Sequence, residues 1–208
     1  MKIIQPTFIS EQILDGVQIL SKIEEYGRTC YKSESKITRE SSLAFVGMLL
    51  KRGHESVLEH EKATMRIICD RGVSHEIVRH RIASYSQEST RYCNYAKDSF
   101  NGELTFIRPC FWAEADVRYR LWRDQMILAE KAYLNLIKEG ALPEEARSIL
   151  PTSLKTEIIM TMNLREWRHF FKLRTPAAAH PQMREITVPM LNFFQEHIPV
   201  IFDDMMRT

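Results

Sequence analysis

The spacing of apolar residues changes along this 208-residue chain, and this change limits the fold class more than any other feature. Some stretches repeat apolar residues every three or four positions, which predicts helices, and others alternate, which predicts strands. We expect helices over residues 10–26, 41–52, 114–139, 164–174 and 182–197, and a short helix over 74–80. We expect strands over residues 63–68 and 155–162, with an extended segment after residue 80. This mixture predicts an α+β fold in which helices flank a central mixed or antiparallel sheet.

Residues at the ends of the expected helices support these limits. Gly27 and Gly140 follow two of the helices, where glycine favours helix termination. Ser74 is placed to cap the short helix. Asn163, with Glu166 three positions later, resembles a capping box. One face of the longest helix is apolar and consists of Val117, Leu121, Leu128, Ala132 and Leu136.

No repeat, low-complexity tract or linker divides the chain, so we expect one domain over residues 1–208. The composition, 44% hydrophobic and 27% charged, is typical of a globular protein. The 29 basic and 27 acidic residues give a net charge of +2, which is too small to indicate a general nucleic-acid binder. Any anion site must therefore be local.

Glycine is scarce, with only 7 residues, and no two glycines form a G-x-G pair. The chain therefore contains neither the dinucleotide fingerprint G-x-G-x-x-G nor the phosphate loop G-x-x-x-x-G-K-[ST]. A phosphorylated ligand would have to be held by side chains, which makes the arginines the candidates.

The four cysteines contain no C-x-x-C pair, which argues against a zinc ribbon and a redox dithiol. His75, Glu76 and His80 depart by one residue from the H-E-x-x-H zinc motif, so no metal site is expected. Cys93 has no identifiable base partner and is expected to be a buried, inert thiol. No signal peptide is apparent, and no apolar stretch approaches the roughly 20 residues that span a bilayer. We expect a cytoplasmic protein that does not associate with a membrane.

The densest polar group consists of Arg79, His80, Arg81, Ser84, Ser86, Gln87, Ser89 and Arg91. Arginine offers a planar fork of donors for phosphate, and serine and glutamine add hydrogen bonds without a second charge. On an extended strand, Gln87, Ser89 and Arg91 would point to the same side. The group indicates an anion pocket, and a solvated basic surface is the alternative that residue types alone leave open.

A second basic group consists of Arg147, Arg165 and Arg174. Arg174 lies on the same helical stripe as Trp167 and Phe170. An arginine among aromatic side chains is costly to bury without an anionic partner. Arg174 is therefore a candidate for a functional or interface role.

Several motifs resemble one known family. Arg79-His80-Arg81, followed after seven residues by Ser89, resembles the RHR-x7-S signature of the flavin-dependent thymidylate synthases. Further segments resemble other blocks of that family in the same order: HESVLEH at 54–60, RSILP at 147–151, NLR at 163–165, FKLR at 171–174 and residues 182–186. The resemblance covers most of the chain.

The resemblance implies an enzyme that transfers the methylene group of 5,10-methylenetetrahydrofolate to C5 of dUMP, forming dTMP. FAD would supply the hydride after reduction by NADPH, and no enzyme cysteine would act as nucleophile. Members of the family are homotetramers whose active sites combine residues from several subunits, and no nucleic-acid partner is implied. A non-catalytic nucleotide- or RNA-binding module with the same arginines is the alternative. A flavoprotein with a different methyl acceptor is a third possibility.

By position, the resemblance implies two sets of contacts. The expected FAD contacts are Ser56, Arg79, His80, Arg81, Gln87, Asn163, Leu164, Arg165 and His169. The expected dUMP contacts are Glu76, Ile77, Val78, Arg79, Gln87, Glu88, Ser89, Thr90, Arg91, Arg147 and Arg174. Arg174 is the expected catalytic residue, because a cation against the uracil stabilises the negative charge that develops there. His54 is expected near the flavin and folate rings.

Overall fold

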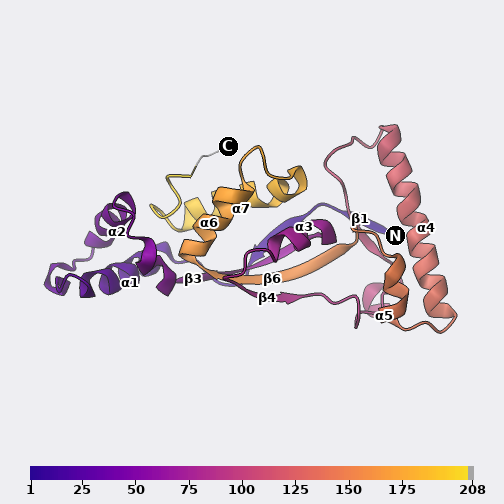
Figure 1. Cartoon of the computed structure of the whole chain (residues 1–208), viewed down its shortest axis with the longest axis horizontal. Helices are drawn as coiled ribbons and strands as arrows, with labels where there is room; N and C mark the ends of the chain where they lie inside the picture. The colour runs from indigo at the N-terminus through magenta and orange to yellow at the C-terminus, as the bar shows by residue number, and fades with distance from the viewer. Residues whose placement is uncertain (206–208) are drawn as a thin grey trace. The chain divides into compact units, whose positions relative to one another are not determined.

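The computed structural model describes residues 1–205 and confirms a mixed α+β fold (Figure 1). The strands are β1 (Lys2–Ile4), β2 (Thr7–Ser10), β3 (Lys62–Asp70), β4 (Ser84–Gln87), β5 (Thr105–Ile107) and β6 (Lys155–Asn163). The α-helices are α1 (Gly16–Thr29), α2 (Ser41–Lys51), α3 (Arg71–Ile77), α4 (Val117–Lys138), α5 (Pro143–Ala146), α6 (Leu164–Arg174) and α7 (Pro181–His197). The 3₁₀ helices are η1 (Glu34–Lys36), η2 (Glu55–His60), η3 (Asp98–Phe100) and η4 (Arg147–Ile149). Within the described residues, no helix is both long and apolar enough to cross a membrane.

The strands within residues 1–205 form two sheets. β1 and β5 pair in parallel, with Ile3 opposite Phe106, and the other strands form a sheet in the order β2-β3-β6-β4. Along β3 and β6 every second side chain is buried, as the alternating sequence pattern predicts. These buried residues are Ala63, Met65, Ile67 and Cys69 on β3 and Thr156, Ile158, Met160 and Met162 on β6.

The chain divides into two compact units, which are described separately. The first unit consists of Met1–Thr7, Ile67–Arg79 and Tyr85–Ile159, and the second of Phe8–Arg66, His80–Ser84 and the residues from Met160 onward. The core of the first unit contains Tyr95, Leu104, Phe106, Met126, Tyr133, Ala146 and Leu154. The core of the second unit contains an aromatic cluster of Trp167, Phe170, Phe171, Phe194 and Phe202. The expectation of one domain over 1–208 stays a prediction.

The limits expected for the first helix are wrong at both ends. α1 begins at Gly16, where the carboxylate of Asp15 accepts a hydrogen bond from the backbone N–H of Gln18 (3.0 Å). It also continues through Gly27, which does not terminate it. A glycine is needed at this position because α2 packs closely against α1. A Cβ at Gly27 would lie only 2.7 Å from Cε1 of Phe45.

α3 and α4 also differ from what the sequence predicts. The cap of α3 is Asp70 rather than Ser74, since Oδ1 of Asp70 accepts a hydrogen bond from the backbone N–H of Val73 (2.7 Å). α4 begins three residues later and ends one residue earlier than expected, and Leu121 and Leu128 on its apolar face are 61% and 55% exposed. The residues of α4 that are buried instead are Tyr119, Met126 and Tyr133. Aromatic rings bury more area than leucine, and the aliphatic stripe is left at the surface.

α6 has the limits that the sequence predicts, and it packs beside α7 in the second unit (Figure 1). Asn163 caps α6 through Oδ1, which accepts a hydrogen bond from the backbone N–H of Glu166 (2.9 Å). α7 starts at Pro181, one residue before the expected start, and continues through Pro189 to His197 as a single helix. The aromatic residues Trp167, Phe170 and Phe171 of α6 lie in the core of the second unit.

Candidate functional site

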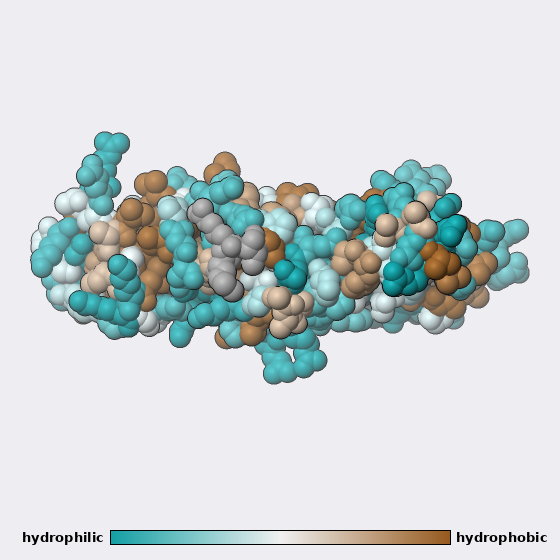
Figure 2. Space-filling view, turned by 90° about the horizontal axis from the view of Figure 1, so that it is seen from above, coloured by the Kyte–Doolittle hydropathy of each residue, from teal (hydrophilic) through white to brown (hydrophobic). Residues whose placement is uncertain are grey.

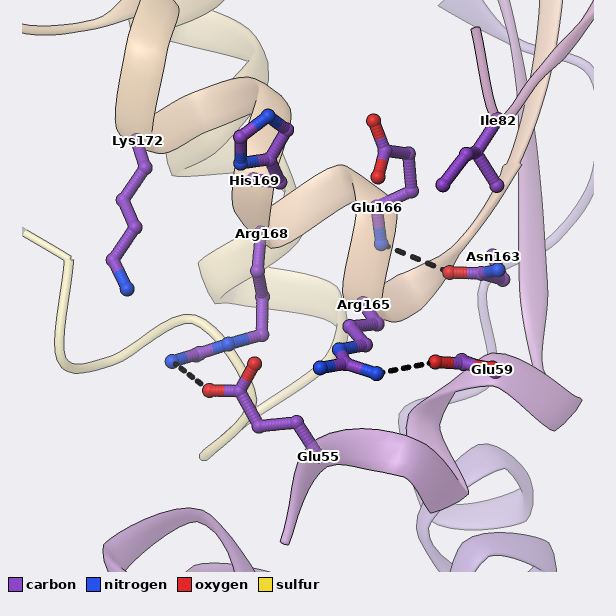
Figure 3. Close-up of a pocket in the computed structure, with 9 residues that line it drawn as sticks. All are labelled: Glu55, Glu59, Ile82, Asn163, Arg165, Glu166, Arg168, His169 and Lys172. Atoms are coloured by element: carbon purple, nitrogen blue, oxygen red, sulfur yellow. Dashed lines mark hydrogen bonds and ion pairs between the residues drawn. The ribbon is translucent and has the colours of Figure 1, made fainter. Parts of the chain in front are cut away.

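A cavity of about 540 Å³ opens beside α6 in the second unit (Figure 3). Its lining residues are Glu55, Glu59, Ile82, Asn163, Arg165, Glu166, Arg168, His169 and Lys172. Three expected FAD contacts, Asn163, Arg165 and His169, are among them. The cavity therefore brings together part of the expected cofactor site.

The helical repeat of α6 explains why it supplies most of the lining. Arg165, Arg168 and Lys172 follow one another at intervals of three and four residues, so they lie on one side of the helix. Asn163 lines the cavity next to them because its side chain caps the same helix. Figure 3 shows Arg165 and Arg168 of α6 pointing toward Glu59 and Glu55 of η2.

Glu59 and Arg165 pair across this cavity. Oε1 of Glu59 accepts a hydrogen bond from Nη1 of Arg165 at 2.5 Å, and this bond raises the pKa of Arg165. A guanidinium has five N–H donors, so this one bond leaves further donors for an anion in the cavity.

Arg168 is buried, and its guanidinium joins three parts of the second unit. The carboxylate of Asp204 accepts hydrogen bonds from both Nη atoms, at 2.7 and 2.6 Å. Oε1 of Glu55 lies 3.2 Å from Nη2, and the carbonyl of Ile201 accepts a further bond from Nη1. Arg168 therefore ties α6 to η2 and to the segment that follows α7.

His80 holds the expected catalytic residue. Nε2 of His80 accepts a hydrogen bond from Nε of Arg174 (3.1 Å), and Nδ1 lies 3.7 Å from Oε1 of Glu166. The ring packs edge-on against Phe170, with 4.9 Å between ring centroids. Burial first, and then the charges of Arg174 and His169, lower the pKa of His80 to about 4. The ring is therefore neutral near pH 7.

The same side chains offer donor atoms to a metal. Atoms of His80, Glu166 and His169 that can bind a metal lie within 4.8 Å of one another. Arg174 already occupies Nε2 of His80 and adds positive charge, which opposes the binding of a cation. The expectation of no metal site stays a prediction.

In the first unit, several expected dUMP contacts have side chains that are already engaged. The Nε2 group of Gln87 donates to the hydroxyls of Ser74 (2.9 Å) and Thr156 (3.1 Å). Ile77 is buried, and its carbonyl accepts a hydrogen bond from the hydroxyl of Tyr85 (2.9 Å). These residues could contact a nucleotide only through atoms outside these bonds.

The side chain of Glu88, another expected dUMP contact, is also engaged in hydrogen bonds within the first unit. One carboxylate oxygen accepts a hydrogen bond from the hydroxyl of Tyr95 (2.8 Å), and the other accepts one from Nζ of Lys155 (2.6 Å). Burial and then the charge of Glu88 raise the pKa of Tyr95. The Glu88 side chain is therefore part of the framework of the first unit.

The expectation that Gln87, Ser89 and Arg91 share one side of a strand is wrong. β4 ends at Gln87, and the chain then turns, with Oγ of Ser89 accepting a hydrogen bond from the backbone N–H of Arg91 (3.2 Å). Nε of Arg91 donates to Glu144 on α5 (3.0 Å). Glu144 lies three residues before Arg147, so this bond links the turn to the segment that carries Arg147.

The other expected contacts differ in exposure. Those that are exposed are Ser56, Val78, Arg79, Arg81 and Arg147, and those that are buried are Leu164 and Thr90. Glu76 is half-buried. The backbone N–H of Leu164 donates to the carbonyl of Glu61 (2.9 Å). His54 is exposed, and its Nδ1 lies 3.1 Å from the hydroxyl of Tyr31.

Six residues of the cavity were not expected from the sequence. They are Glu55, Glu59, Ile82, Glu166, Arg168 and Lys172. The sequence contains a pattern that could have identified two groups of these residues. Glu55 and Glu59 are four residues apart within the HESVLEH segment, and the charged residues of α6 repeat with the helical period.

Comparison with known proteins gives consistent results. Residues 14–200 match the family described as Thymidylate synthase complementing protein. The flavin-dependent thymidylate synthase of Geobacter sulfurreducens is 37% identical over 184 residues, which cover 85% of this chain and 78% of that protein. The flavin-dependent thymidylate synthase of Corynebacterium aurimucosum is 34% identical, and the match covers 96% of this chain and 85% of that protein.

A solved structure supports the fold. The crystal structure of a UMP/dUMP methylase, PolB from Streptomyces cacaoi bound with 5-Br dUMP, matches with a TM-score of 0.79. The match covers 98% of this chain and 96% of that chain at 22% sequence identity. The two proteins therefore share a fold.

Proposed function

Because the chain belongs to the flavin-dependent thymidylate synthase family, we propose that it methylates dUMP to form dTMP. The carbon donor is 5,10-methylenetetrahydrofolate, and NADPH reduces the bound FAD. The observation that carries the proposal is the cavity beside α6, where Asn163, Arg165 and His169 lie together.

The residues of this cavity suit a dinucleotide. Arg165 can bind a pyrophosphate through the donors that its bond to Glu59 leaves unused. Lys172 adds a second cation on the same side of α6, and Asn163 and His169 add polar groups. The chain has no glycine-rich phosphate loop, so a site made of side chains agrees with its composition.

When bound, the flavin would supply the hydride that converts the transferred methylene group into a methyl group. The chain's own residues bind and orient the reactants. The phosphate of dUMP is the ligand that Ser89, Arg91 and Arg147 suit, and the bond from Arg91 to Glu144 supports the convergence of these residues. Glu88 would take part through its backbone, because its carboxylate is engaged elsewhere.

Arg174 is the proposed catalytic residue. Its guanidinium would stabilise the negative charge that develops on the pyrimidine as N3 ionises and C5 becomes nucleophilic. The hydrogen bond to His80 supports this role, because a neutral acceptor fixes the direction of the guanidinium without neutralising its charge. The proposed reaction needs no cysteine nucleophile.

The proposal is tested on purified protein. We expect bound-flavin absorbance, and release of tritium from C5-labelled dUMP that requires both NADPH and the folate. Arg174→Ala should keep the flavin and lose turnover. A colourless, inactive protein that binds single-stranded RNA with a steep salt dependence would contradict the proposal.

We also expect a homotetramer. Apolar side chains are exposed in both units: Ile13 and Val17 in the second are 93% and 71% exposed, and Leu121 and Leu128 of α4 are exposed in the first. Figure 2 shows hydrophobic surface over the segments that carry α1, α2 and α4. Such patches are characteristic of association surfaces. Light scattering should give four times the mass of one chain, and Leu128→Asp should lower that mass. A monomeric wild type would contradict the tetramer.

A further inference from the structure

The protonation state of His80 decides whether it can hold Arg174. The ring is 5% exposed, and its pKa of about 4 makes it neutral at neutral pH. A neutral imidazole has one nitrogen that carries a proton and one that accepts a hydrogen bond. Only the form that accepts at Nε2 can bind Arg174, so the choice of tautomer matters.

The bond from Arg174 identifies that tautomer. Arginine has donors and no acceptor, so Nε2 of His80, 3.1 Å from Nε of Arg174, must be the accepting nitrogen. The proton then resides on Nδ1, and this atom lies 3.7 Å from Oε1 of Glu166. The group next to one ring nitrogen sets which nitrogen is protonated, and a carboxylate favours N–H on its own side.

Glu166 is well placed for this task. It lies in the first turn of α6, where the helix dipole favours a carboxylate. Burial raises its pKa, and the charges of His169 and Arg165 act in the opposite direction. Figure 3 shows its carboxylate pointing away from the bond between Arg165 and Glu59, so it is not used in that pair.

We propose that Glu166 is a positioning residue for Arg174. Its carboxylate holds His80 in the Nδ1–H form, which keeps the Nε2 lone pair directed at Arg174 and so fixes the guanidinium. This inference rests on the proposed function, in which Arg174 acts on the pyrimidine. Of the charged groups around His80, Arg174 and His169 disfavour protonation of the ring, whereas Glu166 selects between its two neutral forms.

Glu166→Gln tests the proposal while keeping the size of the side chain. We expect kcat to fall about tenfold or more, as is usual when the orienting partner of a histidine is lost, with unchanged flavin content and KM for dUMP. Glu61→Gln is the matched control. The Glu61 side chain is 13% exposed, as is that of Glu166, and it lies 3.6 Å from Lys22, away from His80. Equal losses in both variants would overturn the proposal.

A double-mutant cycle separates positioning from a general structural effect. If Glu166 acts through His80, then Glu166→Gln should cause no further loss of kcat in a His80→Gln background. Additive losses would show that the two residues act independently and would overturn the proposal.

The tautomer can also be measured without activity. In protein labelled with ¹⁵N-histidine, the ring nitrogen shifts of His80 should report Nδ1–H in the wild type and a shift toward Nε2–H in Glu166→Gln. The same tautomer in both proteins would overturn the proposal. A wild type that lacks flavin and turnover would instead contradict the proposed function, so the two failures are distinguishable.

Discussion

Arg168 and Asp204 form two parallel hydrogen bonds, of 2.7 and 2.6 Å, between a buried guanidinium and a largely exposed carboxylate. The pair fastens the segment after α7 to α6. Nε2 of Gln195 supports the same segment by donating to the carbonyls of Phe202 (3.0 Å) and Met205 (3.2 Å). Arg168 also lines the cavity, so the position of its side chain there depends on the segment after α7 that carries Asp204.

Asp204→Asn should therefore destabilise the protein. The change removes one of the two carboxylate charges that compensate the buried guanidinium and leaves only Glu55. A hydrogen bond to a charged group contributes about 2 kcal/mol. We expect a corresponding decrease in the free energy of unfolding in urea. Glu196→Gln, the same change of charge at an exposed position on α7, is the control and should have little effect. Equal stability of the two variants would contradict the prediction.

The contribution of Asp204 should also depend on pH. The hydrogen bonds from Arg168 lower the pKa of Asp204, against the opposing effect of burial. The stabilisation is then fully present above the ordinary aspartate value of about 3.9 and is lost as the pH falls through the lower pKa of the folded state. The difference in stability between wild type and Asp204→Asn should shrink across that range. A difference that stays constant with pH would contradict this assignment.

Gly27 and Gly47 form a matched pair of helical glycines with opposite expected effects. A Cβ at Gly27 would lie 2.7 Å from Phe45 and 3.2 Å from Leu49, so Gly27→Ala should cost about 1–3 kcal/mol through overpacking. A Cβ at Gly47 would meet only Val200, at 3.8 Å. Gly47→Ala should therefore stabilise the protein by about 0.5–1 kcal/mol. Thermal unfolding of both variants checks the prediction, which fails if the two changes have the same sign.

Sequence patterns are sufficient to locate some elements of this fold and insufficient for others. Alternation located β3 and β6 because one face of each strand is buried along its whole length. Gly27, in contrast, is a residue type that often ends helices, yet α1 continues through it. Only the ring of Phe45, which packs against this position, explains why a glycine lies inside the helix. On α4 an aliphatic stripe and an aromatic stripe compete for the core, and spacing alone does not choose between them.

In the candidate site, the sequence likewise predicts neighbours within one helix and does not predict pairs that are far apart in the chain. The resemblance implied Arg165 and His169 as FAD contacts, and both line the cavity because the helical repeat of α6 places them on one side of the helix. The bond from Arg165 to Glu59 joins residues 106 positions apart, and local spacing contains no information about such a pair. The side chain of Glu88 was expected at a ligand, yet Lys155 and Tyr95 engage it from other elements.

Cys93→Ser should leave methylation of dUMP intact. Burial, and then the charge of Glu88, raise the pKa of the Cys93 thiol, so little of the nucleophilic thiolate exists near neutral pH. We expect unchanged kcat and KM in the tritium-release assay, with Arg174→Ala as the inactive reference. Loss of turnover with normal flavin content in Cys93→Ser would contradict the mechanism without a cysteine nucleophile.

His80 should make the folded state sensitive to mild acid. Its folded-state pKa of about 4 is below the unperturbed value of about 6.5, so between these values the unfolded chain takes up a proton that the folded ring does not. The free energy of unfolding should then fall as the pH falls from about 6.5 to 4, by up to about 1.4 kcal/mol per unit from this residue, and level off below 4. After burial, the charges of Arg174 and His169 lower this pKa further, and Glu166 faces the ring with Oε1 3.7 Å from Nδ1.

Urea unfolding at several pH values tests this dependence. His80→Gln should flatten the slope between pH 6.5 and 4 relative to the wild type, because an amide takes up no proton. His75→Gln, a change at an exposed histidine on α3, should keep the wild-type slope. Equal slopes in the wild type and His80→Gln would mean that the ring titrates alike in the folded and unfolded chain. A buried, neutral His80 as the acceptor for Arg174 would then be ruled out.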